Sequence, residues 1–154
     1  MPTTVKNGEA FKKFVAEMKK AKDCYVAIGL HEDAGEYKDG TSVVNVGLWN
    51  EFGTDNIPER AWMRTTIDEN QGALEEFRKG LIEKVQAGNL TVRQALEKIG
   101  MRIQVLLQNK IGSNMEPENA PSTLKAKARA GQGSRTLIAT GLMQRSVTYK
   151  VYGA

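Results

Sequence analysis

The sequence predicts an α+β domain in which helices pack on a small, mostly antiparallel sheet, with a long exposed loop before the C-terminal strand. Apolar residues recur three and four positions apart in several stretches, which is typical of amphipathic helices. Two shorter stretches alternate apolar and polar residues, as strands with one buried face do. With 154 residues the chain is long enough for one hydrophobic core, so a single domain over residues 1–154 is predicted.

The first elements are a helix, a strand and a surface loop. Residues 7–22 place their apolar side chains on one helical face, with lysines opposite. Residues 24–31 alternate and predict a strand. Residues 32–41 are rich in Gly, Asp and Lys, which favours a loop with a hairpin tip at Asp39-Gly40.

A helix starting after Ser42 is predicted next, because serine is a good N-terminal cap and Gly53 is a common helix stop. A strand over residues 43–46 is the competing interpretation, since β-branched residues favour strands. We prefer the helix. Its predicted apolar stripe consists of Val44, Leu48, Trp49 and Phe52.

Two long helices follow. The first begins at Ala61 and closes at Gly88-Asn89, and the second opens with a capping box at Thr91 and Gln94 and stops at Gly112. Residues 113–136 contain few large apolar groups, so we predict a long exposed connection with at most a short helical turn after Ser122. A short turn, with Thr140 as its cap, and a terminal strand complete the chain.

Charge and composition exclude little. The net charge of +4 permits attraction to nucleic acid or to an acidic protein face, but 22 basic residues are interspersed with 18 acidic ones. No long apolar run and no secretory signal are seen, so we expect a protein that stays in the cytoplasm of its producing cell and has no membrane partner.

Catalytic and metal-binding patterns are missing from the sequence. The chain has a single histidine, His31, and no G-x-S-x-G motif that would supply a serine nucleophile for it. The acidic residues after His31 do not have the spacing of a calcium loop or of a zinc site. The glycines of residues 130–135 lack the Lys-Ser/Thr ending of a phosphate-binding loop. We therefore predict a protein that is not an enzyme and takes no cofactor and no metal.

One basic cluster is a candidate DNA-facing surface. It consists of Lys125, Lys127, Arg129 and Arg135. Several cations on a flexible segment can neutralise phosphates, but no aromatic residues lie between them to stack on bases. We favour another interpretation over DNA binding: a basic loop that is simply solvated, or that becomes ordered against a neighbouring subunit.

Two motifs carry a resemblance to a known family. Residues 50–54 (NEFGT), 57–60 (IPER) and 62–64 (WMR) resemble the N-E-F-G-T, I-P-x-R, aromatic-apolar-R signature of tailed-bacteriophage virion morphogenesis proteins. These are the tail-completion or neck proteins of the head-tail junction. Residues 120–127 (APSTLKAK) and 137–142 (LIATGL), with Ser146, are similar to that family's A-P-x-T, K and L-I-x-T-G-x-L, S pattern.

The resemblance spans roughly residues 24 to 152. It marks these positions as interface or fold-signature residues: Asn50, Glu51, Phe52, Gly53, Thr54, Pro58, Arg60, Trp62, Arg64, Pro121, Thr123, Lys125, Thr140 and Gly141. The chain has Ala61 and Trp62 where family members often have proline and phenylalanine, so an aromatic residue is kept while the rigid proline is lost.

The resemblance implies a structural phage protein that completes the tail or neck and joins tail to head. It would form an oligomeric ring, expected to be a hexamer, around the DNA passage. Its partners would be head-closure or connector proteins and tail tube or tail terminator proteins, with non-specific contact to passing DNA. It would be assembled in the host cytoplasm and reside in the virion. The alternatives are a tail terminator and, from another class, a small basic nucleic-acid-binding protein using residues 125–135.

Residues 50–64 are expected to form a corner between two helices. We predict that Phe52 and Trp62 are buried there and that Glu51 and Arg60 form a charge-assisted pair. Internal packing and a direct subunit contact explain the motif equally well at this point.

Overall fold

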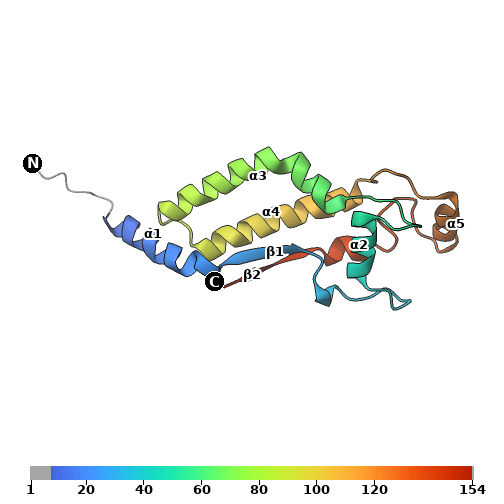
Figure 1. Ribbon diagram of the computed structural model, residues 1–154, viewed down its shortest axis with the longest axis horizontal. Helices are drawn as coiled ribbons and strands as arrows, with labels where there is room; N and C mark the ends of the chain where they lie inside the picture. The colour runs from blue at the N-terminus through green and yellow to red at the C-terminus, as the bar shows by residue number, and fades with distance from the viewer. Residues whose placement is uncertain (1–7, 154) are drawn as a thin grey trace, which may run out of the picture. The chain divides into compact units, whose positions relative to one another are not determined.

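The computed structural model describes residues 8–153 and confirms the α+β prediction (Figure 1). Its two strands pair antiparallel in one sheet. The helices are α1 (Gly8–Lys20), α2 (Val43–Phe52), α3 (Trp62–Gln86), α4 (Val92–Gly112), α5 (Pro121–Arg129) and α6 (Leu142–Ser146), with short 3-10 turns at η1 (Ala21–Asp23) and η2 (Glu32–Ala34), and the strands are β1 (Tyr25–Gly29) and β2 (Thr148–Tyr152). None of these helices is both long and apolar enough to cross a bilayer.

Contacts divide the described chain into two compact units. The first comprises residues 8–27, 70–101 and 149–153, and the second comprises residues 28–69 and 102–148. Helices α3 and α4 and both strands therefore contribute residues to each unit.

In the first unit, the start of α4 is fixed by the predicted capping box. The Thr91 backbone N–H donates to Gln94 Oε1 at 3.0 Å, and the Gln94 N–H donates to Thr91 Oγ1 at 3.2 Å. The carboxylate of Glu17 accepts a further bond from the Val92 N–H at 3.3 Å. These contacts satisfy amides that the first turn of a helix otherwise leaves without partners.

The second unit holds the main hydrophobic cluster and all of the predicted site residues. Its buried side chains come from α2, the first turn of α3, the later part of α4, and residues 137–147. They are Val43, Trp62, Leu107, Ile111, Leu137, Met143 and Val147. The site thus rests on the largest packed cluster among the described residues.

Helix α2 forms as preferred over a strand, but its predicted buried stripe is wrong. Leu48, Trp49 and Phe52 are exposed, whereas the buried residues of α2 are Val43, Gly47 and Glu51. Those three are four positions apart and therefore share one helical face. That face is occupied by a glycine and a carboxylate, so hydrophobicity alone points to the opposite side of the helix.

The hairpin tip at Asp39-Gly40 is confirmed. An antiparallel bridge joins Glu36 and Ser42, and the Gly40 N–H donates to the Tyr37 carbonyl at 2.9 Å. Gly40 has a φ of 82°, a conformation that glycine adopts without steric cost.

The segment from 113 to 136 is more ordered than the prediction of a long exposed connection. It contains α5, whose first residue, Pro121, suits the start of a helix because its missing N–H would have no partner there. Most side chains of the segment are exposed, but Lys127 and Thr136 are buried.

Candidate functional site

The corner between α2 and α3 begins with a sharp glycine turn. Gly53 ends α2 with a φ of 73°, and a Cβ there would lie 3.1 Å from the backbone nitrogen of Glu59. The next residue closes the turn, since Thr54 Oγ1 accepts a bond from the Ile57 N–H at 3.0 Å and the Thr54 N–H donates to the Ile57 carbonyl at 2.8 Å. The Gly-Thr pair of the NEFGT motif is therefore required by backbone geometry.

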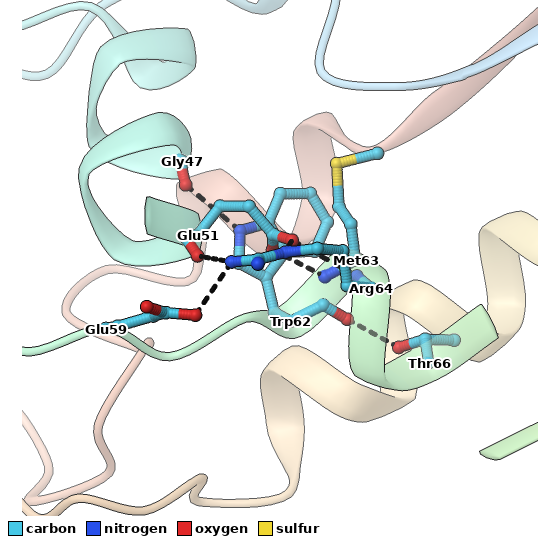
Figure 2. Close-up of polar contacts among 7 residues, drawn as sticks. All are labelled: Gly47, Glu51, Glu59, Trp62, Met63, Arg64 and Thr66. Atoms are coloured by element: carbon cyan, nitrogen blue, oxygen red, sulfur yellow. Dashed lines mark hydrogen bonds and ion pairs between the residues drawn. The ribbon is translucent and has the colours of Figure 1, made fainter. Parts of the chain in front are cut away.

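Trp62 is buried, as predicted, at the first position of α3. Its indole Nε1 donates to the Gly47 carbonyl at 3.1 Å (Figure 2). A Cβ on Gly47 would collide with the side chain of Leu30, so glycine allows the close approach of α2 to its neighbours. The polar handle of the tryptophan is satisfied inside the core, which makes Trp62 a packing residue of this chain.

Glu51 is a buried carboxylate that caps α3. It accepts the backbone N–H of Met63 at 2.7 Å and that of Arg64 at 3.1 Å (Figure 2). These amides belong to the first turn of α3, where the helix dipole favours a negative charge. The predicted pair with Arg60 is wrong, because Glu51 instead accepts a bond from the side-chain Nε of Arg64 at 2.9 Å.

Arg64 joins three groups of the corner. Its Nη2 donates to the Glu51 carbonyl at 2.6 Å and to Glu59 Oε1 at 2.8 Å. Its guanidinium carbon lies 5.1 Å from the centre of the Phe52 ring, within cation–π range. The hydrogen bond to Glu51 raises the pKa of Arg64. The predicted burial of Phe52 is wrong: its side chain is 61% exposed, with Arg64 over the ring.

Arg60 is buried and connects the corner to the loop ahead of α5. Its Nε donates to the Pro117 carbonyl at 2.7 Å, and its Nη2 donates to the Glu118 carbonyl at 3.1 Å. The backbone N–H of Arg60 donates to the Asn50 carbonyl at 2.6 Å. Burial lowers the pKa of Arg60. Arg60 thus ties the first sequence motif to the loop residues that immediately precede the second.

Lys127 is a second buried cation, and its assignment as a DNA-facing residue is corrected. Its Nζ donates to the carbonyls of Arg135, Thr136 and Ile138. Burial, with a smaller effect from the positive charge of Arg60, lowers the pKa of Lys127. The ammonium group is enclosed by backbone oxygens and holds α5 against the chain that follows it.

Replacing Lys127 with methionine should lower the free energy of unfolding by about 1–3 kcal/mol, because three carbonyls lose their donor while the cost of burying the cation is relieved. Urea denaturation measures this. The matched control is Lys125→Met, two residues away on the exposed side of α5, which should change stability by less than about 0.5 kcal/mol. Equal effects of the two substitutions would contradict the buried role of Lys127.

The remaining predicted residues are divided between the corner and the surface. Asn50 lies at the corner, where its Nδ2 donates to the Val46 carbonyl at 2.8 Å, and Pro58 is exposed in the turn. Gly141, rather than the predicted Thr140, is the N-cap of α6, and Thr140 Oγ1 accepts the Leu142 N–H at 3.3 Å from the position before it. Five of the predicted residues are exposed on α5 and the loop that follows it: Pro121, Thr123, Lys125, Arg129 and Arg135.

Sequence reasoning missed two asparagines that hold the segment after α4. Asn114 Oδ1 accepts the Thr136 N–H at 3.0 Å, and Asn119 Nδ2 donates to the Ser134 carbonyl at 2.9 Å. Asparagines in a segment poor in large apolar groups are a signal for side-chain bonds to the backbone. The partners of these two are 22 and 15 residues away, so no spacing rule identifies them.

Hydrogen bonds within the chain fix the surface of the corner between α2 and α3. The charges of Glu51, Arg60 and Arg64 are satisfied within the chain, whereas Leu48, Trp49 and Phe52 remain exposed beside them. Over residues 8–153, no cluster of His, Cys, Asp and Glu side chains that could hold a metal ion is found. The internal contacts of the corner fix its shape, and these three apolar side chains remain at its surface.

Comparison of the chain with family models, with curated proteins and with solved structures found no match.

Proposed function

We propose that this chain is a structural protein of a tailed phage that completes the tail or neck and joins tail to head. It assembles as a ring, expected to contain six copies, around the DNA passage, and it catalyses no reaction. Its neighbours are head-closure or connector proteins on one side and tail tube or tail terminator proteins on the other. The observation that carries this proposal is the pair of motifs at residues 50–64 and 120–142, in the order and separation of the resembled family.

The contacts of these motifs support the proposal. Asn50, Glu51, Arg60, Trp62 and Arg64 belong to one corner, and Arg60 reaches the carbonyls just ahead of the second motif. Through Arg60, the corner joins residues 50–64 to residues 117 and 118, which are far away in sequence. The first motif is therefore anchored to the segment that leads directly into the second.

Exposed apolar side chains give a second support. Among residues 8–153, nine hydrophobic side chains are buried, while twelve large ones are exposed. A chain that keeps so much apolar surface in contact with water is suited to bury it against other subunits. Leu48, Trp49 and Phe52 gather this surface at the corner itself.

The test is the mass of the assembled protein. Light scattering at micromolar concentration should give one closed oligomer with a mass of six copies, and electron microscopy should show rings with a central hole. Mixing these rings with purified connector or with tail tube should show which neighbour binds. A chain that stays monomeric alone and with both partners would overturn the proposal.

A nucleic-acid-binding protein is the second candidate, favoured by the exposed cations Lys125, Arg129 and Arg135. The burial of Lys127 removes one of the four charges on which that interpretation depends. DNA affinity measured against salt separates the two candidates. Binding of about micromolar strength at physiological salt, with a steep salt dependence and no ring, would favour the second candidate.

A further inference from the structure

Helix α1 contacts the rest of its unit through a charged face. Four residues of this inner face line a pocket together with the end of α3 and the start of α4: Lys13, Ala16, Glu17 and Lys20. Their spacing of three, four and seven positions places them on one side of the helix. The contact is a specific one, because Glu17 Oε2 accepts the Val92 N–H at 3.3 Å. The side of α1 that faces its own unit is therefore polar.

The apolar residues of α1 lie on the opposite side of the helix. This apolar stripe consists of Phe11, Phe14, Val15 and Met18. Each of them is two positions from a residue of the inner face, and two positions turn an α-helix by about 200°. Phe11 is 64% exposed and Met18 is 49% exposed, and none of the α1 side chains that the structure describes is buried. The helix thus turns its apolar side to solvent, the reverse of the usual arrangement in a surface helix.

Two lysines border the apolar stripe. Lys12 lies three positions before Val15 and Lys19 lies four positions after it, so both are next to the stripe on the same side. Both lysines are exposed. Lys12 pairs with Glu9 at 3.5 Å, but both of these side chains are largely exposed, and such a pair is weak enough to be exchanged for another anion. The stripe therefore presents apolar groups and positive charge together.

The unit that contains α1 is also basic as a whole. Residues 8–27, 70–101 and 149–153 contain 11 basic and seven acidic residues, a net charge of +4. Residues 28–69 and 102–148 contain ten basic and 11 acidic residues, a net charge of −1. Long-range attraction therefore favours an anionic partner for the unit that contains α1.

These requirements decide among the possible partners of α1. A second copy of this chain brings the same lysines on its own α1, and its other unit is only weakly negative. DNA offers phosphates but no apolar surface for phenylalanine and methionine side chains. An anionic lipid bilayer offers hydrocarbon and negative headgroups side by side, and it needs no groove of matched shape. Helices that lie on such a surface combine an apolar stripe and abundant lysine with low hydrophobicity overall.

We propose that α1 binds the surface of an anionic lipid bilayer. The helix lies parallel to the surface, its apolar stripe enters the boundary between headgroups and acyl chains, and Lys12 and Lys19 contact anionic headgroups. The inner face holds the rest of the unit on the water side. The expectation of no membrane partner rested on the lack of a long apolar run, which a helix lying in the surface does not need. Lipid binding by α1 goes beyond the proposed function and does not depend on it.

Sedimentation of the full chain with lipid vesicles tests the partner. Vesicles of equal parts of phosphatidylcholine and phosphatidylglycerol should bind the protein at least about tenfold more tightly than vesicles of phosphatidylcholine alone, and salt should weaken this binding. Phe11→Ser with Met18→Ser should weaken binding to the mixed vesicles at least about tenfold. The matched control is Met101→Ser with Val105→Ser, two similarly exposed apolar residues of α4, which should bind like the unaltered protein.

Charge reversal tests the headgroup contact. Lys12→Glu with Lys19→Glu should weaken binding to the mixed vesicles at least about tenfold and leave binding to phosphatidylcholine vesicles unchanged. The control is Lys84→Glu with Lys98→Glu, which changes the net charge equally at exposed positions of the same unit and should lose less affinity. Equal losses in the two variants would mean that net charge drives binding without α1 at the surface, and would overturn the proposal.

A fluorescent label tests which side of α1 enters the lipid. In a Cys24→Ala background, an environment-sensitive dye on Phe11→Cys should shift its emission to the blue when mixed vesicles are added. The same dye on Glu9→Cys, two positions away and exposed on the opposite side of the helix, should not. Equal shifts at both positions would contradict contact through the apolar stripe.

The outcomes separate lipid binding from the proposed function. Unaltered protein that binds neither kind of vesicle would overturn the proposal for α1 and leave a protein with an acidic, apolar groove as its better partner. Binding that persists without Phe11 and Met18 would overturn it as well. The ring is measured as a mass without lipid, so a chain that never assembles but binds vesicles through α1 would overturn the proposed function alone. Circular dichroism of each variant, whose substituted side chains are all exposed, checks that the fold is kept.

Discussion

Replacing Trp62 with alanine should lower the free energy of unfolding of the monomer by about 3–5 kcal/mol. The indole is 1% exposed, lies in the main hydrophobic cluster, and donates its only polar hydrogen to Gly47. Alanine would leave a cavity between α2 and α3, and the Gly47 carbonyl would lose the bond that it accepts from the indole. Urea denaturation followed by far-ultraviolet circular dichroism, at a concentration below assembly, measures the loss.

Trp49 provides the matched control, since it is the other tryptophan of the chain and lies on the exposed side of α2 at 40% exposure. Trp49→Ala should change the unfolding free energy of the monomer by no more than about 1 kcal/mol. A Trp62→Ala monomer that unfolds like the unaltered protein but no longer assembles would show that Trp62 is a subunit contact and that the packing argument is wrong.

Local patterns predicted most of the helices and strands. The period of three and four positions found α1, α3 and α4, because that spacing places apolar side chains on one face of a helix. The capping box at Thr91 and Gln94 fixed where α4 begins, because both partners lie within one turn. Such features depend on neighbours in sequence, so the sequence alone is enough to find them.

The face of α2 could not be predicted in the same way. Its buried positions include Gly47 and Glu51, which a hydrophobic pattern assigns to water. Gly47 is buried because the side chain of Leu30 packs where a Cβ would otherwise lie. Glu51 is buried because α3 supplies backbone donors for its carboxylate. The contact at Gly47 comes chiefly from Leu30, earlier in the chain, and the donors to Glu51 come from α3, later in the chain, so neither reason is local in sequence.

The candidate site was located by its motif, but its pairings were not. From the sequence, Glu51 is predicted to pair with Arg60, and only the fold directs Arg60 toward Pro117 and Glu118 and Arg64 toward Glu51. The burial of Lys127 has no local signal either, because its partners are backbone carbonyls. Backbone oxygens are present in every sequence, so no residue pattern reveals which of them will surround a cation.

Glu51→Gln is expected to lower the free energy of unfolding by about 2–4 kcal/mol. Glutamine keeps the size of the side chain, but its amide NH₂ would face N–H groups of Met63 or Arg64 where an oxygen now accepts them. The negative charge that favours the first turn of α3 is lost as well. Most of the effect comes from these buried bonds, because the Arg64 side chain is half exposed and can return to water.

Glu59→Gln distinguishes capping from simple ion pairing. Glu59 also bonds Arg64, at 2.8 Å, but its side chain is 54% exposed, so its loss should change stability by less than about 1 kcal/mol. If both substitutions had the same small effect in urea denaturation, Glu51 would be only one more surface partner of Arg64. A large effect of Glu51→Gln alone would mean that one buried carboxylate fixes where α3 begins, and with it the position of Trp62.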